Sequence, residues 1–450
     1  LRSLSICHSF TINVNNDSPA QPKWAHSNKP KDTPSAGLRD VLPLCNAMPK
    51  KIIIIGAGFG GLGCAKAFAD AKDSGVDVTV VDAKSYFTIG GTWQYAWAGR
   101  VDTEKTTWDL SKCGAQFPGV SMLLDTDVAS LDMEGKKVVL GDGTALGYDH
   151  LVLSPGVVGD PSSVPGMADT IDMYSHDSIE RQRSDVHDIV AKARAGETQT
   201  LLVAIGAVPY KCPVAPFEAA FIADDVLRRA GVRDKVDIVV TAPVAWPLPD
   251  PARAVFTRLF EEKNVRFIPE KAIASVEDGA VAKFADGDSM TCSKIWSVYP
   301  QRAPDFVKAT GTCNTRGFVP VDIATNGVEG KDGVYCVGDC CGIAVGGKPH
   351  PKAGEFAWQM GEMVAHDILK TEGYEHSRLG ACIAECGAGA GVLVAPDYTQ
   401  CVKDPESGKP SCAIEDRKTD GEAAKLDWVN KYIRYIFGED GRKFEPAAAA

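Results

Sequence analysis

The stretch that decides the fold is KIIIIGAGFGG at residues 51–61, in which four consecutive isoleucines lead directly into a glycine-rich turn. A continuous β-branched run is typical of a strand that is buried on both faces of a parallel sheet. We expect a helix to follow over about 62–71 and a second strand over 76–81. Strand, glycine turn, helix and strand in this order predict a parallel βαβ unit.

The glycines of this turn have the G-x-G-x-x-G spacing of a dinucleotide-binding fingerprint. Gly56 permits the tight turn, Gly58 lets the backbone approach a pyrophosphate, and Gly61 allows the helix to pack closely on the strand. Gly60 belongs to the same turn, and the free backbone amides of this turn at the helix N-terminus would bind phosphate. Asp82, which closes the second strand, would accept hydrogen bonds from an adenosine ribose. A glycine-rich turn in an ordinary α/β domain is the alternative, and the agreement of strand, helix and acid disfavours it.

The composition excludes several classes of protein. With 450 residues, 44% of them hydrophobic, the chain is long enough for two or three domains. A net charge of −11 argues against a nucleic-acid partner. No apolar run reaches the roughly 18 residues of a membrane-spanning helix, and the 14 cysteines show no zinc-site spacing. We therefore expect a protein without a metal site that is soluble or lies on a membrane surface.

Residues 1–47 differ from the rest of the chain, because they are rich in Asn, Ser, Pro and Lys and show no strong periodicity. We expect a disordered leader, a targeting segment or a remnant of cloning. The segment has no apolar core of a secretory signal, and acids interrupt it as a transit peptide.

A second βαβ unit is expected over residues 200–240, with its helix at about 216–230. In its turn only Gly206 matches a fingerprint glycine, because Val208 and Lys211 occupy the other positions. The second strand also ends without an acid for a ribose. Both halves of the signature are missing, so NAD(P)H binding at this turn is disfavoured.

The same turn presents a thiol, Cys212, within YKCPVAPFE at residues 210–218. A cysteine flanked by prolines in place of a phosphate-binding loop suggests that electrons arrive through sulfur rather than from a nicotinamide. Most free cysteines are buried hydrophobic residues, and this is the alternative for Cys212. Its position favours the redox role. Neighbouring Lys211 would lower the thiol pKa by about one unit or more if it faced inward.

Residues 333–339, GVYCVGD, predict a short buried strand that ends in Gly338 and Asp339. A glycine-rich loop and a helix at about 352–369 follow. In flavin enzymes an acid at such a strand end binds the cofactor's hydroxyls, and the next helix directs its positive end at the flavin. Gly338, Asp339 and Lys352 at the start of the helix are therefore predicted to bind a flavin, with an ordinary strand-to-loop aspartate as the alternative.

The predicted fold class is α/β with two Rossmann-like βαβ domains. Short alternating runs at 121–146 predict antiparallel hairpins, and residues 148–156 a strand that returns to the first sheet. We expect a discontinuous FAD-binding domain at residues 48–160 and 295–370, with a second Rossmann-like domain inserted at 161–294. A small C-terminal domain is expected at 371–450.

These pieces, in this order, resemble the two-dinucleotide-binding flavoprotein superfamily with the glutathione-reductase architecture. Within it, the chain is most similar to the sulfide:quinone oxidoreductase and flavocytochrome c sulfide dehydrogenase group, over about residues 50–438. The FAD motifs are shared by the superfamily, whereas Lys211-Cys212-Pro213 followed by residues 215–218 is specific to the sulfide-oxidising branch. The resemblance implies FAD as cofactor, a small sulfur substrate and a quinone as acceptor.

The family's second redox cysteine lies near the C-terminus, and residues 380–384, which lead to 394–398, resemble that segment. The resemblance implies Cys382 as the partner of Cys212, with Cys386, one helical turn farther on, as the weaker candidate. Sulfide would attack a Cys212–Cys382 disulfide and leave a persulfide and a thiolate.

The chain departs from the family pattern in three places. Ile89 stands where flavocytochrome c has a flavin-tethering cysteine, so FAD is expected to bind non-covalently. No Cys-x-x-x-x-Cys follows the first βαβ unit, which excludes a disulfide reductase of the glutathione reductase type. Several sulfide:quinone oxidoreductases have a third cysteine between the segments matching Gly156 and Thr200, and this chain has none there.

Residues 426–437, LDWVNKYIRYIF, predict an aromatic-rich helix with Lys431 and Arg434 interleaved. Such a helix fits a membrane interface from which a quinone would enter, and it fits equally well against the protein body or a second subunit. We expect membrane association at a cytoplasmic face, or at an organellar inner membrane if residues 1–47 are a transit segment. The oligomeric state stays open, a homo-oligomer included.

Two further residues have the chemistry for proton transfer, Glu218 and His350. A helix N-terminal acid and a solvated loop histidine are the alternatives, and they are slightly favoured. A flavocytochrome c-like dehydrogenase, a type II NADH:quinone oxidoreductase and a flavin-binding protein without turnover are the competing functions.

Overall fold

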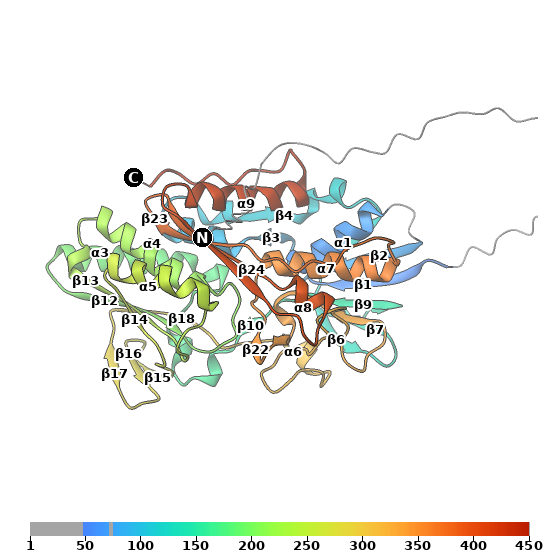
Figure 1. The fold of residues 1–450 in the computed structure, drawn as a ribbon, viewed down its shortest axis with the longest axis horizontal. Helices are drawn as coiled ribbons and strands as arrows, with labels where there is room; N and C mark the ends of the chain where they lie inside the picture. The colour runs from blue at the N-terminus through green and yellow to red at the C-terminus, as the bar shows by residue number, and fades with distance from the viewer. Residues whose placement is uncertain (1–47, 72–74, 450) are drawn as a thin grey trace, which may run out of the picture. The chain divides into compact units, whose positions relative to one another are not determined.

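The computed structural model describes residues 48–71 and 75–449, and the expectation for residues 1–47 lies outside them. Two parallel sheets, each covered by helices, occupy the two halves of the described chain in Figure 1. This confirms the predicted α/β class with two Rossmann-like cores.

The first sheet has five strands in the order β20-β9-β1-β2-β5, and all of its pairs are parallel. Its helices α1 (Phe59–Asp70) and α7 (Gly354–Leu369) lie against each other. A Cβ on Gly361 would stand 2.1 Å from the carbonyl oxygen of Gly60, so this close crossing requires glycine. The strands are β1 (Lys50–Ile55), β2 (Val76–Val81), β5 (Val120–Leu123), β9 (His150–Leu153) and β20 (Val334–Cys336).

The second sheet is also parallel and has the order β11-β18-β12-β13-β14. The strand that comes last in the sequence, β18, continues past residue 294, where the boundary of the inserted domain was expected. The division of the chain into domains stays a prediction. Its strands and helices are β11 (Ile171–Asp172), β12 (Gln199–Ile205), β13 (Val236–Thr241), β14 (Val265–Ile268), β18 (Lys294–Val298), α3 (Ile179–Arg194), α4 (Ala215–Arg229) and α5 (Arg253–Glu262).

Smaller sheets connect these elements. The antiparallel hairpins predicted over 121–146 are confirmed for β6, β7 and β8, whereas β5 pairs in parallel with β2 and joins the first sheet. The remaining short elements are β3 (Tyr86–Thr88), α2 (Trp93–Trp97), β4 (Thr107–Asp109), β6 (Val128–Asp132), β7 (Lys137–Leu140), β8 (Ala145–Gly147), β10 (Val158–Gly159), β15 (Ile273–Glu277), β16 (Val281–Phe284), β17 (Ser289–Thr291), β19 (Gln301–Arg302), α6 (Asp305–Lys308), β21 (Ala344–Val345) and β22 (Lys348–Pro349).

A third, antiparallel sheet near the C-terminus consists of β23 (Cys382–Gly387), β24 (Ala390–Asp397) and β25 (Ser411–Arg417). The two residues between the first two strands, Ala388 and Gly389, both have left-handed backbone conformations, as a tight hairpin turn requires. Cys386 therefore lies on a strand, and the expectation that it stands one helical turn from Cys382 is wrong. Strand β23 packs on both α4 and α9 (Gly421–Phe437) and so connects the two halves of the described chain. Short helix α8 (Thr399–Lys403) follows β24.

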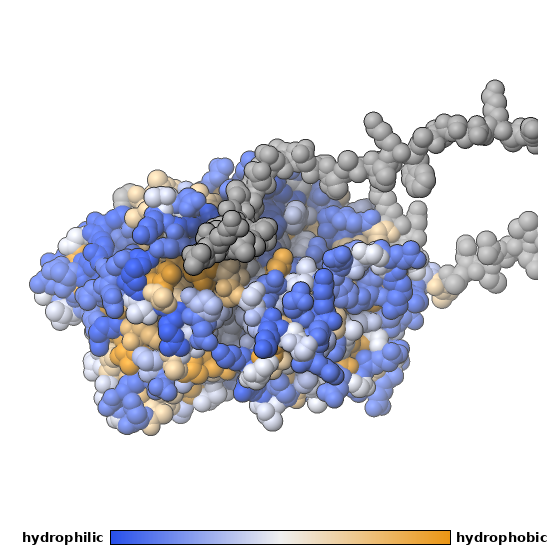
Figure 2. Space-filling model, in the orientation of Figure 1, coloured by the Kyte–Doolittle hydropathy of each residue, from blue (hydrophilic) through white to orange (hydrophobic). Residues whose placement is uncertain are grey.

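Helix α9 packs most of its aromatic face on the protein body. Val429, Tyr432 and Ile433 are at most 1% exposed, and Trp428 stacks on Phe59 with ring centroids 5.8 Å apart. Tyr435, at 44% exposed, is the aromatic residue of this helix that projects outward. Over residues 48–71 and 75–449 no helix has both the length and the apolar character needed to cross a membrane. On the face in Figure 2, hydrophilic side chains predominate.

Candidate functional site

The first glycine turn has the shape that a dinucleotide requires. Gly56 adopts a φ of +101°, and a Cβ on Gly61 would stand 1.8 Å from the Gly56 carbonyl oxygen. The space above Gly58 is open, and no side chain caps the N-terminus of α1. Asp82 lies beside the turn, because its Oδ2 accepts a hydrogen bond of 2.6 Å from the Ala57 amide. Uncapped amides, open space and an adjacent acid fit a pyrophosphate and its ribose.

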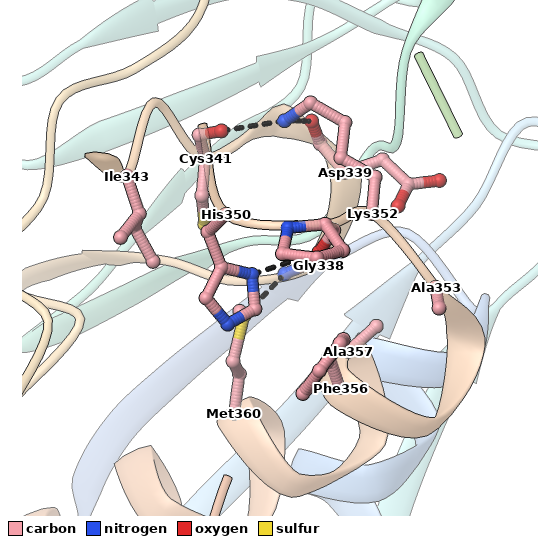
Figure 3. Close-up of a pocket in the computed structure, with 11 residues that line it drawn as sticks. Gly338, Asp339, Cys341, Ile343, His350, Lys352, Ala353, Phe356, Ala357 and Met360 are labelled. Atoms are coloured by element: carbon pink, nitrogen blue, oxygen red, sulfur yellow. Dashed lines mark hydrogen bonds between the residues drawn. The ribbon is translucent and has the colours of Figure 1, made fainter. Parts of the chain in front are cut away.

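A second part of the site surrounds the N-terminus of α7, where Figure 3 shows a small pocket between this helix and the loop that follows β20. Gly338 has a φ of +75°, and no side chain caps α7. Burial raises the pKa of Asp339, while Lys352 and Lys211 act to lower it. An uncapped helix end and a half-buried acid lie together there, as the sequence predicts for the residues that hold a flavin.

Lys352 is committed to the backbone rather than to a carboxylate. Its Nζ donates hydrogen bonds of 2.7 Å to the carbonyl oxygens of Asp339 and Cys341, as Figure 3 shows. Burial lowers its pKa. His350 in the same loop is 4% exposed and burial holds its pKa well below the ordinary value, so the expectation of a solvated histidine is wrong.

The thiol loop is joined to this flavin-side loop by backbone atoms. The Cys212 amide donates a hydrogen bond of 2.7 Å to the Lys352 carbonyl oxygen. The backbones of Lys211 and Lys352 form an isolated parallel β-bridge. Tyr174 Oη donates to the Cys212 carbonyl oxygen at 2.9 Å. Cys212 itself has a φ of +48°. The structure thus brings Cys212 next to the loop that carries Asp339 and Lys352.

The charges beside the Cys212 thiol differ from those expected. Burial, and after it the Glu218 carboxylate, raise the pKa of Cys212 to about 12, while Lys425 acts to lower it. Lys211 instead places its ammonium group 5.7 Å from the ring centroid of Tyr174. The cation that acts on the thiol is Lys425 of α9, which lies 207 positions from its partner Glu218 and could not be found from a local motif.

Cys382 lies at the start of β23, within the electrostatic reach of Cys212. Burial raises the pKa of Cys382 well above its ordinary value, and Cys212 adds to this effect. Cys386 is 2% exposed on the same strand and also lies near Glu218. Cys412 of β25 acts on Cys382 as well. All four cysteines are free thiols in the structure.

The second βαβ turn lacks the features that bind a dinucleotide. Tyr210 is 2% exposed and donates from its hydroxyl to the Pro213 carbonyl oxygen at 3.0 Å. The second strand of this unit ends at Thr241, which is uncharged. The turn thus offers neither a glycine cradle nor an acid to a nicotinamide dinucleotide.

A parallel sheet with an open glycine turn, a second Rossmann-like sheet without a glycine cradle, and a half-buried acid near the N-terminus of α7 are typical of the two-dinucleotide-binding flavoproteins. Residues 50–361 match the profile of the pyridine nucleotide-disulphide oxidoreductase family, and the chain belongs to this family. It is a flavin-dependent oxidoreductase, and FAD is its cofactor. The predictions of fold class, family group and cofactor are confirmed.

The curated relatives of the chain include two kinds of quinone oxidoreductase. It is 24% identical over 328 residues to the mitochondrial sulfide:quinone oxidoreductase of Schizosaccharomyces pombe, which covers 65% of this chain and 69% of that protein. It is 23% identical over 370 residues to a type II NADH:quinone oxidoreductase of Staphylococcus aureus, covering 76% of this chain and 89% of that protein. The chain spans about two thirds of the length of the curated sulfide:quinone relatives.

Among solved structures, the sulfide:quinone oxidoreductase of Aquifex aeolicus superposes with a TM-score of 0.71 at 17% identity. The match covers 88% of this chain and 96% of that chain. This similarity shows the fold.

Proposed function

We propose that this flavoprotein oxidises sulfide, or a related small sulfur species, through Cys212 and Cys382 and passes the electrons by way of FAD to a quinone. The observation that carries the proposal is the position of Cys212. It stands in the turn where a nucleotide-binding glycine loop is expected, and its backbone amide is hydrogen-bonded to the Lys352 carbonyl oxygen in the flavin-side loop. The similarity to named sulfide:quinone oxidoreductases supports the choice of substrate and acceptor.

The residues that would hold FAD form two groups. Gly56, Gly58, Gly60 and Gly61 would bind its pyrophosphate and Asp82 its adenosine ribose, because they line an uncapped helix N-terminus. Gly338, Asp339 and Lys352 would face the flavin end, near the N-terminus of α7. FAD supplies a two-electron acceptor at this place.

The cysteines would perform thiol–disulfide exchange. Sulfide attacks one sulfur of a Cys212–Cys382 disulfide, so the S–S bond between the cysteines breaks and a new S–S bond to the incoming sulfur forms. One cysteine then carries the persulfide and the other leaves as a thiolate that holds the electron pair. Lys425 lowers the pKa of Cys212 and would stabilise that thiolate.

The quinone would approach along a membrane surface. The exposed Tyr435 of α9 and the exposed Leu379 ahead of β23 are the hydrophobic side chains available for such a contact near this end of the chain. The curated sulfide:quinone relatives are mitochondrial proteins by name, which supports an organellar membrane.

A type II NADH:quinone oxidoreductase is the second candidate, because the relative of that name matches over 89% of its length. The second βαβ turn, which has neither a glycine cradle nor an acid at the end of its second strand, argues against it. Rapid bleaching of the flavin by NADH would decide for this second function.

The deciding experiment is anaerobic stopped-flow reduction of the holoenzyme by sulfide, with wild type compared with Cys212→Ser. We expect wild type to bleach and the variant to bleach at least about 100-fold more slowly, as for loss of an essential nucleophile. Cys292→Ser is the matched control, since this buried cysteine lies in another core cluster and is expected to leave the rate unchanged.

Equal rates for wild type and Cys212→Ser would contradict the thiol mechanism. Decylubiquinone should reoxidise the reduced flavin, and reoxidation only by a haem protein would favour a flavocytochrome c-like dehydrogenase. A yellow protein that neither sulfide nor NADH reduces would be a flavin-binding protein without turnover.

A further inference from the structure

The backbone of Cys212 has a conformation that its place in the sequence disfavours. Its φ of +48° lies in the left-handed region, which is unfavourable for a residue that has a Cβ. Pro213 follows, and the residue before a proline prefers an extended backbone with a negative φ. Such a conformation persists only where the surrounding structure enforces it, and conformations of this kind cluster at functional sites.

Three hydrogen bonds hold the Cys212 backbone, and they act on both sides of its Cα. On the amide side, the N–H donates to the Lys352 carbonyl oxygen at 2.7 Å. On the carbonyl side, the oxygen accepts from Tyr174 Oη at 2.9 Å and from the Ala215 amide at 3.0 Å. The bond from Ala215 lies within the turn that starts α4, so it does not tie Cys212 to anything outside its own loop. The other two bonds anchor the residue to distant parts of the chain.

Tyr174 can serve as an anchor because its own backbone is fixed. It follows β11, and its amide donates a hydrogen bond of 2.9 Å to Asp172 Oδ1. The amide of the preceding residue, Met173, donates to the Ser297 carbonyl oxygen of β18 at 3.0 Å. The phenol hydroxyl therefore reaches Cys212 from the second sheet, on the side opposite to the bond from the flavin-side loop.

We propose that Tyr174 is a positioning residue that holds Cys212 in the left-handed conformation and thereby sets the direction of its thiol for exchange with Cys382. Bonds on both sides of Cα leave the Cα–Cβ bond of Cys212 a single direction. Cys212 and Cys382 are both partly buried and pack against the same hydrophobic cluster. Two groups held in place react far more readily than two that must first find a common orientation. The inference rests on the thiol pair proposed above and names what positions one member of it.

A second tyrosine in the same region provides a matched control. Tyr210 donates from its hydroxyl to the Pro213 carbonyl oxygen at 3.0 Å, one residue beyond Cys212. The rings of Tyr210 and Tyr174 are neighbours, with centroids 6.3 Å apart. Tyr174→Phe and Tyr210→Phe each remove one hydroxyl and one hydrogen bond to the thiol loop. Only Tyr174→Phe releases the carbonyl of Cys212.

The first experiment measures the backbone preference at position 212 by chemical denaturation of the FAD-loaded protein. Glycine tolerates the left-handed region better than alanine does, so the unfolding constant of Cys212→Gly should be about fivefold or more below that of Cys212→Ala. In combination with Tyr174→Phe the residue can relax, and the difference should fall below about twofold. In combination with Tyr210→Phe it should persist. A Gly–Ala difference that Tyr174→Phe leaves unchanged would overturn the positioning role.

The second experiment measures the exchange between the two cysteines. The protein is equilibrated with reduced and oxidised glutathione, and one oxidised glutathione takes the two electrons and two protons of the thiol pair and becomes two reduced ones. Free thiols are then trapped, and peptide mass spectrometry quantifies the Cys212–Cys382 disulfide. We expect Tyr174→Phe to lower the equilibrium constant for this disulfide about tenfold. Tyr210→Phe should change it by less than about twofold.

Anaerobic reduction by sulfide separates positioning from substrate binding. In Tyr174→Phe the limiting rate of flavin bleaching should fall about tenfold. The sulfide concentration that gives half of the limiting rate should stay within about twofold of wild type. A merely structural role would instead lower the stability of Tyr174→Phe and Tyr210→Phe alike and leave the limiting rate and the disulfide equilibrium unchanged.

The outcomes distinguish this inference from the function on which it rests. A wild type that forms no Cys212–Cys382 disulfide and is not bleached by sulfide would reject the thiol function. The Gly–Ala comparison at position 212 needs neither sulfide nor a disulfide, so it decides in that case whether Tyr174 imposes the conformation. A wild type that does both, matched in both by Tyr174→Phe, would overturn the positioning role alone.

Discussion

At the scale of single residues, two opposite charges flank the thiol of Cys212. Glu218 raises its pKa and Lys425 lowers it, on top of the larger rise caused by burial. With a pKa of about 12, the thiol of Cys212 is mostly protonated at a pH where an ordinary cysteine is largely ionised. The reduced thiol is therefore expected to be slow to react until the pH is strongly alkaline.

This charge balance can be tested by alkylation of the reduced protein with iodoacetamide as a function of pH. Glu218→Gln should move the midpoint for Cys212 to lower pH, because it removes an anion, and Lys425→Met should move it higher. Mass spectrometry of the Cys212 peptide gives the rates, and Glu362→Gln serves as the unchanged reference. Shifts in the same direction for both variants would contradict the assignment of the two charges.

At the scale of elements, the crossing of α1 and α7 places two helix N-termini at the candidate cofactor site. Gly361→Ala would put a Cβ 2.1 Å from the Gly60 carbonyl oxygen and force the helices apart. We expect a loss of about 1–3 kcal/mol in the free energy of unfolding and weaker retention of FAD. Gly114→Ala is the control, because nothing lies within 4 Å of its Cβ position. Equal denaturation midpoints and equal FAD content would contradict this role of the crossing.

The elements that the sequence predicts well are those defined by local pattern. The run of isoleucines and the glycine turn lead to β1 and α1, although α1 begins at Phe59 rather than at about residue 62. The helical position predicted for Cys386 is wrong because a short apolar segment does not distinguish helix from strand, and the hairpin turn that decides for a strand lies beyond it, at Ala388 and Gly389.

The candidate site is predictable only in part, because local patterns indicate its turns but not its long-range contacts. Cys212 and Asp339 stand at turns that follow recognisable strands, so their neighbourhood could be inferred. Lys425 and Glu385 belong to no motif. They reach the site because each contacts Glu218, Lys425 across 207 positions of the sequence and Glu385 across 167. Such contacts are set by how β23 and α9 pack on α4, which no local pattern encodes.

At the scale of the whole molecule, the C-terminal segment after α9 returns to an early part of the chain. Phe444 is 1% exposed and packs on Tyr95 and Trp108, with ring centroids 5.4 and 6.2 Å away. Ala447 and Arg100 form two hydrogen bonds of 2.8 Å: the Ala447 amide donates to the Arg100 carbonyl oxygen, and Arg100 Nε donates to the Ala447 carbonyl oxygen. The segment therefore holds Arg100, the cation that contacts Glu385.

Phe444→Ala should remove about 3–5 kcal/mol from the free energy of unfolding, because it empties a fully buried aromatic position. Tyr435→Ala, at an exposed position on α9, should change it by less than about 0.5 kcal/mol. Chemical denaturation of the two variants measures both values. A similar small effect for both would mean that the C-terminal segment does not stabilise this part of the molecule.

The bond between the thiol loop and the flavin-side loop has a consequence for how such a protein can evolve. It joins the Cys212 amide to the Lys352 carbonyl oxygen, so neither side chain takes part. Substitution at position 352 leaves the carbonyl in place, and at position 212 only proline would remove the amide hydrogen. A lineage can therefore lose the thiol, and with it the chemistry, while the two loops stay fastened, and descendants without a redox cysteine would keep the same architecture.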